Sequence, residues 1–335
     1  MKISIALCTY NGEKFLQKQL ESILWQTLLP NELVACDDNS TDETRRILDE
    51  FRKEAPFLVK ICQNDQNLGI TRNFEKAIGL CSGDIIVLCD QDDVWKPEKI
   101  AIIKDVFRKN PGTGYVFSDA NLVGENLQPL GIGLWESVGF QGEFVSRYTA
   151  GKQLSCFLRQ QFVTGATLAM HTSLKEFIFP FPENQKWIHD GWIALVGSSV
   201  GQNGIPVPLQ LINYRQHQGQ QIGAPDSPPP GTLLAQYQIL KQTRKYHVEE
   251  WIAFSSFFPY LLDRLYQHRS ADNQAIERSI ETLEEFLRFF CTRKEIFTAQ
   301  GFSKFVPVFR EFISGRYGKF SYGWKSAFAD LILSS

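Results

Sequence analysis

Short apolar runs alternate with amphipathic stretches over the first third of the chain. The runs are rich in β-branched residues, as in strands buried on both faces of a sheet, and the amphipathic stretches have the three-to-four-residue spacing of helices. Four such repeats predict a parallel sheet with right-handed crossovers. The predicted strands cover residues 3–7, 33–36, 58–61 and 85–88, and the predicted helices cover residues 13–26, 41–54, 70–81 and 97–109.

The pattern is less regular after residue 110. Apolar runs predict strands at 115–117, 163–171 and 209–214 and a helix at 193–200, whereas residues 124–159 are rich in glycine and aromatic residues and are expected to be irregular. We therefore expect one α/β domain over residues 1–222, with halves at 1–110 and 111–222.

A proline-rich segment at residues 223–231 predicts a linker to a helical region over residues 232–335. Apolar residues recur there at helical spacing over residues 233–247, 249–268, 272–291 and 304–314. We expect the phenylalanines of this region to pack between helices, namely Phe286, Phe289, Phe290, Phe302, Phe305, Phe309 and Phe312.

The composition is that of an ordinary globular protein. The 335 residues are 43% hydrophobic and carry a net charge of −2, so nothing favours nucleic acid as a partner. The seven cysteines have no zinc-site spacing, and no apolar stretch approaches the ~20 residues of a membrane span. The N-terminal apolar run is too short for a signal peptide. We expect a cytoplasmic protein, in solution or peripheral at the inner face of the cell membrane.

A polar turn follows each of the four predicted strands, at residues 8–12, 37–42 and 67–73 and at the acidic cluster Asp90, Asp92 and Asp93. All four turns fall on the edge of the sheet where open α/β folds bind ligands. Each turn alone is better explained by turn formation or helix capping, but four together favour a binding site. Clustered carboxylates favour a hard cation such as Mg²⁺ or Mn²⁺. No glycine-rich dinucleotide or P-loop motif is present.

The turns resemble, in their order and spacing over residues 1–220, those of a family 2 glycosyltransferase with the GT-A fold. The resemblance implies a nucleotide-sugar-binding α/β fold, with a mostly parallel central sheet flanked by helices, and a C-terminal helical region. It rests on Thr9-Tyr10-Asn11, Asp37-Asp38-Asn39-Ser40-Thr41-Asp42, Asn67-Leu68-Gly69 with Arg72-Asn73, and Gly83-Asp84 leading to Asp90-Gln91-Asp92-Asp93.

The resemblance also implies roles for residues of these turns. Thr9, Tyr10 and Asn11 would line the nucleoside pocket. Asp38 would accept the N3–H of uracil or thymine, which cytosine lacks. Arg72 would lie against the base or the diphosphate, and Asp90 would also contact the nucleotide-sugar. Asp90 and Asp92 would form the family's Asp-x-Asp motif, with Asp92 as a direct ligand of Mn²⁺ or Mg²⁺.

Further candidates lie later in the chain. Asp190, at the start of a predicted helix, matches the family's general base, although His189 stands where many members have Glu; an N-cap role is the alternative. Tyr214-Arg215-Gln216-His217 resembles the rhamnosyltransferase-like branch, so Arg215 would neutralise phosphate and His217 would bind metal or diphosphate. Trp187 and Trp192 would stack on sugar rings or pack in the core.

The resemblance implies an inverting, metal-dependent enzyme that moves one sugar from a nucleoside-diphosphate sugar, dTDP-rhamnose or a UDP-sugar, to a hydroxyl of a glycan or lipid-linked glycan in cell-surface polysaccharide synthesis. A nucleotidyltransferase would need a glycine-rich loop with a lysine near residues 8–12, which is absent. A binding module without catalysis would be expected to lose Asp92 or Asp190, and both are present.

The C-terminal tail suggests two further partners. Residues 316–325 mix basic and aromatic side chains, which can anchor a protein at a membrane surface, although plain packing explains the same residues. A homodimer through the C-terminal helices is a second hypothesis.

Overall fold

The computed structural model describes residues 1–183, 188–220, 257–270, 273–299 and 301–332. The chain divides into two compact units. The first contains Met1–Thr149, Phe162–Phe181 and Trp187–Asp226, and the second contains Ala150–Gln161, Pro182–Lys186 and Ser227–Ser335. The predicted linker at 223–231, the predicted helix at 233–247 and Trp187 lie outside the described residues.

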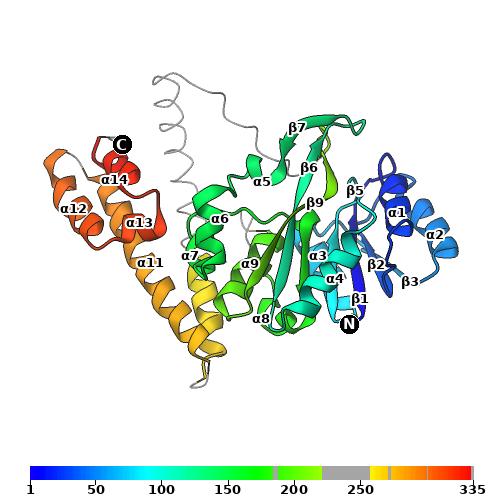
Figure 1. The fold of residues 1–335 in the computed structure, drawn as a ribbon, viewed down its shortest axis with the longest axis horizontal. Helices are drawn as coiled ribbons and strands as arrows, with labels where there is room; N and C mark the ends of the chain where they lie inside the picture. Colours follow the sequence, from blue (N-terminus) through cyan, green and yellow to red (C-terminus); the bar gives the residue numbers. More distant parts are fainter. Residues whose placement is uncertain (184–187, 221–256, 271–272, 300, 333–335) are drawn as a thin grey trace. The chain divides into compact units, whose positions relative to one another are not determined.

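The first half of the first unit is a parallel sheet (Figure 1). Its strands run side by side in the order β3, β2, β1, β4, and every neighbouring pair is parallel, as predicted. All residues of β1, β2 and β4 are buried, because helices cover both faces. The strands are β1 (Ile3–Thr9), β2 (Glu32–Asp37), β3 (Leu58–Gln63) and β4 (Ile85–Cys89).

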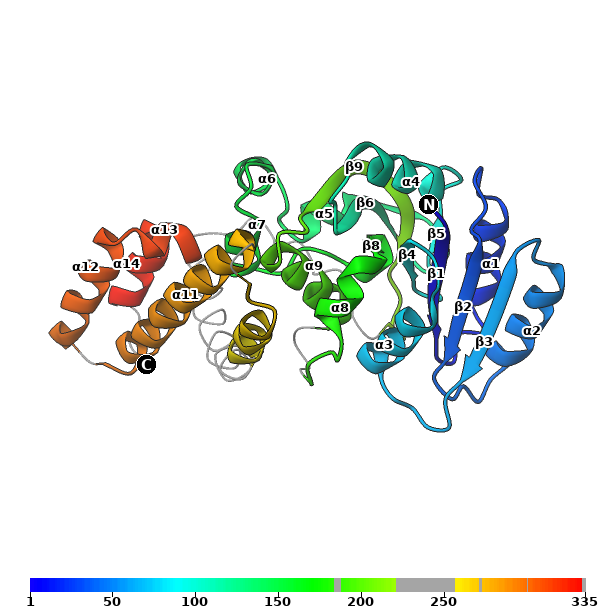
Figure 2. The ribbon, with the colours of Figure 1, turned by 90° about the horizontal axis from the view of Figure 1, so that it is seen from below.

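Four helices follow these strands and divide between the two faces of the sheet (Figure 2). The helices α1 (Leu16–Leu24), α2 (Thr44–Glu54) and α4 (Lys99–Lys109) share one hydrophobic core with alternate residues of β1 and β4. The helix α3 (Ile70–Leu80) packs against β1 and β2 and covers the opposite face. The ends of β1, β2 and β4 therefore lie on a sheet that is packed between helices on both faces.

The second half of the sheet is mixed. From β4 the order continues β8, β6, β9, β5, and β7 pairs with β6. The pairs β4–β8, β6–β8, β6–β7 and β5–β9 are antiparallel, and β6–β9 is parallel. The strands are β5 (Val94–Trp95), β6 (Tyr115–Val123), β7 (Pro129–Gly133), β8 (Leu168–His171) and β9 (Gly204–Arg215). The helix α9 (His189–Ser199) packs on β6 and β9 and is buried along its whole length.

Two predictions for this half were wrong. Only Leu168–His171 of the predicted strand 163–171 is a strand, because Gly165–Thr167 form the 3₁₀ turn η1. The amide and the hydroxyl of Thr167 both donate to the Thr164 carbonyl and close this turn. The predicted irregular segment 124–159 contains β7 and three helices of four to eight residues, too short for a helical period to show. They are α5 (Leu134–Ser137), α6 (Gly142–Thr149) and α7 (Gln153–Phe157). The remaining short elements near β8 are η2 (Thr172–Leu174) and α8 (Lys175–Ile178).

The second unit is helical in its described part. A helix runs over residues 257–267, followed by α11 (Gln274–Thr298), η3 (Gly301–Lys304), α12 (Phe305–Ile313), α13 (Arg316–Phe320) and α14 (Trp324–Ile332). Asn273 caps α11 by accepting a hydrogen bond from the Ile276 amide, and the helix continues past its predicted end at residue 291. No helix within the described ranges is both long and apolar enough to cross a membrane.

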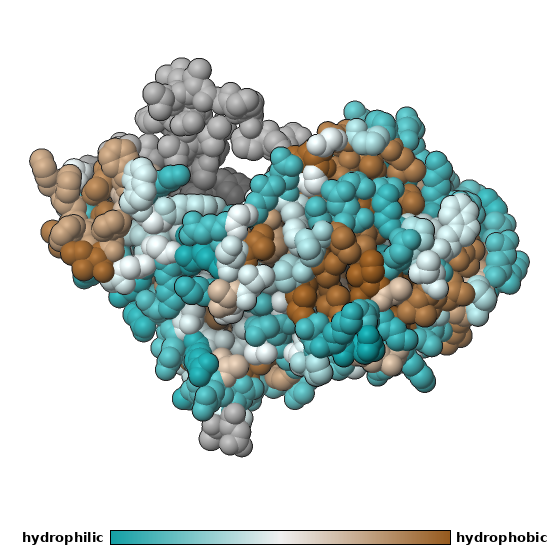
Figure 3. Space-filling view, in the orientation of Figure 1, coloured by the Kyte–Doolittle hydropathy of each residue, from teal (hydrophilic) through white to brown (hydrophobic). Residues whose placement is uncertain are grey.

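The phenylalanines of the second unit divide into two groups. Phe286 and Phe289 are buried and pack edge-on or tilted against Phe320. In contrast, four phenylalanines that were expected to pack between helices are exposed, so this prediction was wrong for them. Helical spacing marks an apolar face without showing what covers it. Figure 3 shows hydrophobic residues on the surface over α12. The exposed fractions are 88% for Phe302, 52% for Phe305, 65% for Phe309 and 46% for Phe312.

Candidate active site

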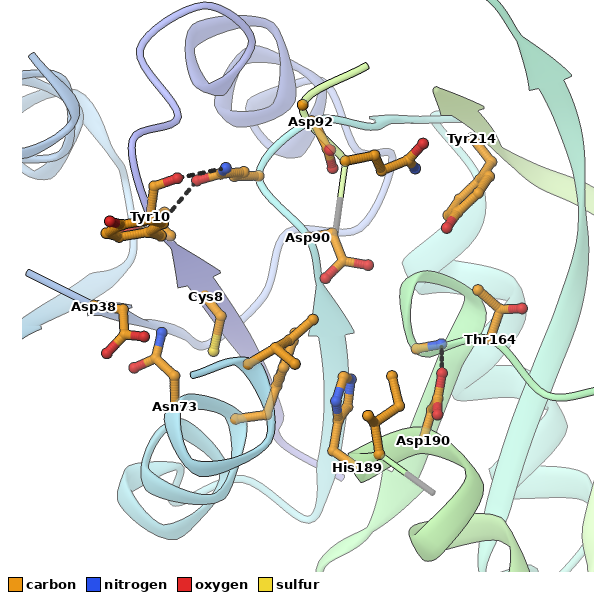
Figure 4. A pocket seen from close by; sticks show the side chains of 18 residues that line it. Cys8, Tyr10, Asp38, Asn73, Asp90, Asp92, Thr164, His189, Asp190 and Tyr214 are labelled. Atoms are coloured by element: carbon orange, nitrogen blue, oxygen red, sulfur yellow. Dashed lines mark hydrogen bonds between the residues drawn. The ribbon is translucent and has the colours of Figure 1, made fainter. Parts of the chain in front are cut away.

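A cavity of about 300 Å³ lies in the first unit where β1, β2 and β4 end. Figure 4 shows Asp38 on one side of this cavity, Asp190 on the other and Asp90 between them. Six predicted site residues line it: Thr9, Tyr10, Asp38, Asp90, Asp92 and Asp190. Four others do not: Asn11, Arg72, Arg215 and His217.

The first turn is tied to its two neighbours. The Tyr10 amide donates to Oε1 of Gln91 (2.8 Å), and Nε2 of Gln91 donates to the Tyr10 carbonyl (3.0 Å). Asn11 has a left-handed backbone (φ 47°), and its Oδ1 accepts from the Thr41 amide at 2.9 Å. Asparagine tolerates this conformation, so Asn11 connects two turns instead of lining the cavity.

The neighbouring acids Asp37 and Asp38 have different surroundings. Asp37 is fully buried and accepts hydrogen bonds from the hydroxyls of Thr9 (2.9 Å) and Ser40 (2.5 Å), so it shapes the turn. Asp38 lines the cavity and accepts from Asn64 Nδ2 (2.7 Å) and from the amides of Leu68 and Gly69 (2.8 and 2.9 Å). A carboxylate has about four acceptor sites, so Asp38 can accept one more hydrogen bond from a ligand.

The acidic cluster follows β4. Burial, together with the negative charges of Asp92 and Asp190, raises the pKa of Asp90 to about 8. Burial also raises the pKa of Asp93, whose Oδ1 accepts from the Arg215 amide at 3.0 Å. These carboxyl groups therefore hold protons more readily than usual because their negative charges would repel one another, and a bound cation would relieve the same repulsion.

Lys99 is buried behind the acidic cluster. Its Nζ donates to the Ala166 carbonyl at 2.7 Å and lies 4.0 Å from the centre of the Trp95 ring. Burial lowers the pKa of Lys99 to about 8, although nearby acids oppose the shift. This ammonium group offsets part of the negative charge from inside the protein.

Asp190 lies in the first turn of α9, whose N-cap residue is Ile188, so the N-cap interpretation of Asp190 was wrong. Its Oδ2 accepts from the Gly165 amide at 2.8 Å and its Oδ1 from the Gly191 amide at 2.6 Å. The helix N-terminus and these amides stabilise a carboxylate beside the cavity. Trp192, two residues further along α9, is fully buried and donates to the Ile178 carbonyl (2.8 Å), so it packs in the core and does not stack on a sugar.

Comparison with known proteins identifies the first part of the chain. Residues 4–136 match the family model described as Glycosyl transferase family 2. This chain carries a glycosyltransferase family 2 domain. An uncharacterized glycosyltransferase of Nostoc sp. is 29% identical over 219 residues, which make up 65% of this chain and 65% of that protein. The dTDP-rhamnosyl transferase RfbG of Shigella flexneri is 34% identical over 125 residues, which make up 36% of this chain and 40% of that protein. The chain thus spans less than two thirds of either relative.

A solved structure shares the fold. TarS of S. aureus in complex with UDP-GlcNAc has a TM-score of 0.57 at 16% identity, and the match covers 98% of this chain and 90% of that chain. At this identity the likeness shows the fold alone. The predicted fold class, a GT-A fold with a helical C-terminal region, is confirmed.

Three of the predicted residues that do not line the cavity contact other parts of the first unit. Arg72 pairs with Glu75 and donates to the Phe181 carbonyl at 3.1 Å, which directs it to the 179–181 segment. Nε of Arg215 donates to the Asp92 carbonyl at 2.6 Å. Nε2 of His217 lies 2.8 Å from Oδ2 of Asp92. Arg215 and His217 therefore fix the position of Asp92.

The acidic end of the cavity has ligand types that suit Mn²⁺ or Mg²⁺. In the described part of the chain, no group of three His, Cys, Asp or Glu side chains is placed to hold a metal ion by itself. Asp92 and His217 are in contact, and burial together with the charge of Asp92 raises the pKa of Asp90. A cation would relieve this repulsion, and diphosphate oxygens would complete its coordination. The residues present fit such an ion.

Other cavity residues were missed by the sequence analysis. Phe74 and Ile70 gave no signal, because apolar residues at helical spacing are usually core. Gly165 lay in a segment that was predicted only as a strand, and Gln91 occupies the variable position of Asp-x-Asp. Tyr214, whose motif was recognised, also lines the cavity.

Proposed function

We propose that this chain is an inverting, metal-dependent glycosyltransferase that moves one sugar from a nucleoside-diphosphate sugar to an acceptor hydroxyl. The observation that carries the proposal is that Asp38, Asp92 and Asp190, far apart in the sequence, line the same cavity. A base-recognition group, a cation ligand and a proton acceptor around one cavity are what this reaction needs.

Asp38 would select the base of the donor. Its free acceptor capacity suits the N3–H of uracil or thymine, and cytosine has no such donor. Thr9 and Tyr10 would complete the nucleoside pocket, which they line. We propose dTDP-rhamnose or a UDP-sugar as donor, in line with the Shigella relative named as a dTDP-rhamnosyl transferase.

The acidic end of the cavity would hold the diphosphate. Asp90, Asp92 and His217 would bind Mn²⁺ or Mg²⁺, which supplies positive charge to the leaving nucleoside diphosphate. Arg215 would support this site by fixing the backbone of Asp92, with which it shares a hydrogen bond of 2.6 Å. Stabilisation of developing charge in this way is usually the largest catalytic contribution.

Asp190 would act as the general base. It would take the proton of the acceptor hydroxyl while the hydroxyl oxygen attacks the anomeric carbon from the face opposite the diphosphate. One bond forms as the bond to the diphosphate breaks, so the anomeric configuration inverts. The amides of Gly165 and Gly191 hold the carboxylate in place.

We further propose a glycan or lipid-linked glycan as acceptor, in cell-surface polysaccharide synthesis. Peripheral membrane contact is supported by the exposed aromatic residues Phe305, Phe309 and Trp324 of the second unit. Within the tail that suggested such contact, however, Tyr317 and Phe320 are buried. Sedimentation with anionic lipid vesicles tests the proposal, and a homodimer through these helices would appear as a doubled mass in light scattering.

A panel of nucleotide-sugars tests the proposed function. We expect UDP- and dTDP-sugars with Mn²⁺ to raise the melting temperature and to be hydrolysed slowly, whereas cytidine nucleotides do neither. The variant Asp38→Asn should lose the preference for uracil and thymine. Binding without hydrolysis or transfer would indicate a binding module. No response to any nucleotide-sugar would refute the proposal.

A further inference from the structure

His189 lines the cavity, and the proposed mechanism does not use it. Its side chain lines the cavity yet is only 2% exposed, and neither ring nitrogen has a hydrogen-bond partner. Buried polar groups in native proteins nearly always have a partner, because an unpaired one destabilises the fold. An imidazole left unpaired in the wall of a ligand cavity points to a partner that arrives with the ligand.

The position of the ring is fixed by stacking. The His189 ring lies against the Phe74 ring, with centroids 3.9 Å apart and planes at 19°. In Figure 4 it stands between Asn73 and Asp190. A half-turn about Cβ–Cγ preserves this stack while it exchanges the two nitrogens with the two ring carbons. The packing therefore permits either edge of the ring to offer its nitrogens to a ligand.

Gly165 preserves the space around this ring. A Cβ atom at Gly165 would lie 2.6 Å from Nε2 of His189 and 3.6 Å from Oδ2 of Asp190. Any other residue would displace the imidazole, whereas its distance to the carboxylate would be an ordinary contact. The glycine amide meanwhile donates to Oδ2 of Asp190 at 2.8 Å, so one backbone position serves both neighbouring side chains.

The ring is uncharged over the physiological range, since burial lowers the pKa of His189 to about 3. A neutral imidazole has one donor and one acceptor nitrogen, which matches a sugar hydroxyl, itself both donor and acceptor. A carboxylate at this position would add to the charge of Asp90, Asp92 and Asp190. The histidine therefore recognises a hydroxyl without adding negative charge beside the diphosphate site.

We propose that His189 hydrogen-bonds to a hydroxyl of the sugar that is bound between the acidic cluster and Asp190, and thereby selects and positions that sugar. The inference rests on the proposed function and deepens it. A donor lacking the hydroxyl would leave the buried nitrogen unpaired, and sites built to bind a hydroxyl reject such analogues strongly. A histidine that is only structural would be replaced without loss by phenylalanine.

Deoxy-sugar donors test this role. The UDP- or dTDP-hexose hydrolysed fastest in the panel is compared with its monodeoxy analogues, in the wild-type protein and in His189→Phe, His189→Gln and the control His171→Phe. His171 lies on β8 and does not line the cavity. We expect His189→Phe to melt at an equal or higher temperature, because it removes two unpaired buried nitrogens.

The expected kinetic result is specific to one hydroxyl. In the wild type and in the control, kcat/KM should fall about 10- to 100-fold for one monodeoxy donor. In His189→Phe, kcat/KM for the parent donor should already be lower by this 10- to 100-fold factor. The monodeoxy donor that the wild type rejects should then be used by His189→Phe as well as the parent donor. His189→Gln, which retains a donor and an acceptor, should recover part of the loss.

Three outcomes would overturn the inference. Equal kcat/KM and equal analogue discrimination in the wild type and His189→Phe would show a packing role only. If His189→Phe fails to fold, the inference is tested with His189→Gln and with the monodeoxy donors on the wild type. A wild type that accepts every monodeoxy donor as well as the parent donor contradicts the inference. In both cases the wild type still turns over, so the proposed function stands. If the wild type neither binds nor hydrolyses any nucleotide-sugar, the proposed function fails and the inference fails with it.

Discussion

Chemically identical side chains have different tasks in this protein because their partners differ. Asp37 and Asp38 are adjacent carboxylates, but the hydroxyls around Asp37 close a turn, whereas Asp38 is held by an amide side chain and two backbone amides with its remaining acceptor capacity toward the cavity. The resemblance singled out Asp38, which lies in the cavity wall.

At the scale of one residue, Asp190→Asn tests the base. An amide cannot accept the hydroxyl proton, so turnover should fall about 10²–10⁴-fold, the usual contribution of a general base. Donor binding should persist, because Asn keeps the size of the side chain and Asp190 is not assigned to the nucleotide. Steady-state kinetics and donor calorimetry measure the two effects. Near-normal turnover would remove Asp190 from this role.

Glu32 predicts a pH effect on stability in a part of the first unit away from the cavity. Burial alone would raise its pKa, but hydrogen bonds from Lys60, Ser4 and Ser82 outweigh burial and lower the pKa to about 2. Because the folded pKa lies below the ordinary 4.5, the stabilisation is complete above pH 4.5 and is lost as the pH falls toward 2.

A shift of this size corresponds to about 3 kcal/mol at most. Glu32→Gln should lower the free energy of unfolding by up to that amount at pH 7, and the difference should vanish near pH 2. Urea unfolding across this pH range measures it. Glu54→Gln is the control, since Glu54 is exposed. A difference that does not depend on pH would contradict the assignment.

At the scale of elements, α11 and α12 show the limit of periodicity. Both have apolar residues at helical spacing, yet Phe289 of α11 is 2% exposed and Phe309 of α12 is 65% exposed. Phe289→Ala should lower the free energy of unfolding of the second unit by about 3–5 kcal/mol, the usual loss for a buried ring. Phe309→Ala should change it by less than about 0.5 kcal/mol. Urea unfolding compares them, and equal losses would mean that a partner surface covers α12.

The elements of the first unit were predicted unevenly. The four strand–helix repeats were predicted correctly, because each is a local pattern that a sheet covered on both faces requires. The 3₁₀ turn at Gly165–Thr167 was not predicted, because its backbone is bent by hydrogen bonds to Thr164 and by the contact of Gly165 with Asp190, which is distant in the sequence. The short helices α5, α6 and α7 were missed because they are too short to show the helical spacing of apolar residues.

At the scale of the whole molecule, ligand effects should be confined to one unit. All the residues that line the cavity belong to the first unit. UDP with Mn²⁺ at about 100 times its Kd should slow hydrogen exchange up to ~100-fold in peptides from the first unit that carry the turns at 8–12, 64–73 and 88–93. Peptides of α11 should be unchanged.

Asp92→Ala provides the control for this experiment. It removes a proposed metal ligand, so the part of the protection that depends on Mn²⁺ should disappear while the fold remains. Mass spectrometry of exchanged peptides measures both proteins. Equal Mn²⁺-dependent protection in the variant would exclude Asp92 as a ligand.

The sequence by itself determined the parallel sheet, the polar turns at its edge and the two acidic motifs, because strands, helices and turns follow from neighbouring residues. Only the tertiary structure decided which side chains share a cavity. Arg72 and Asn11 carry the right chemistry but are turned toward other partners, whereas Phe74, Gly165 and His189 became site residues through contacts between α3, η1 and α9. Contacts between segments far apart in the chain depend on packing, which no local pattern encodes.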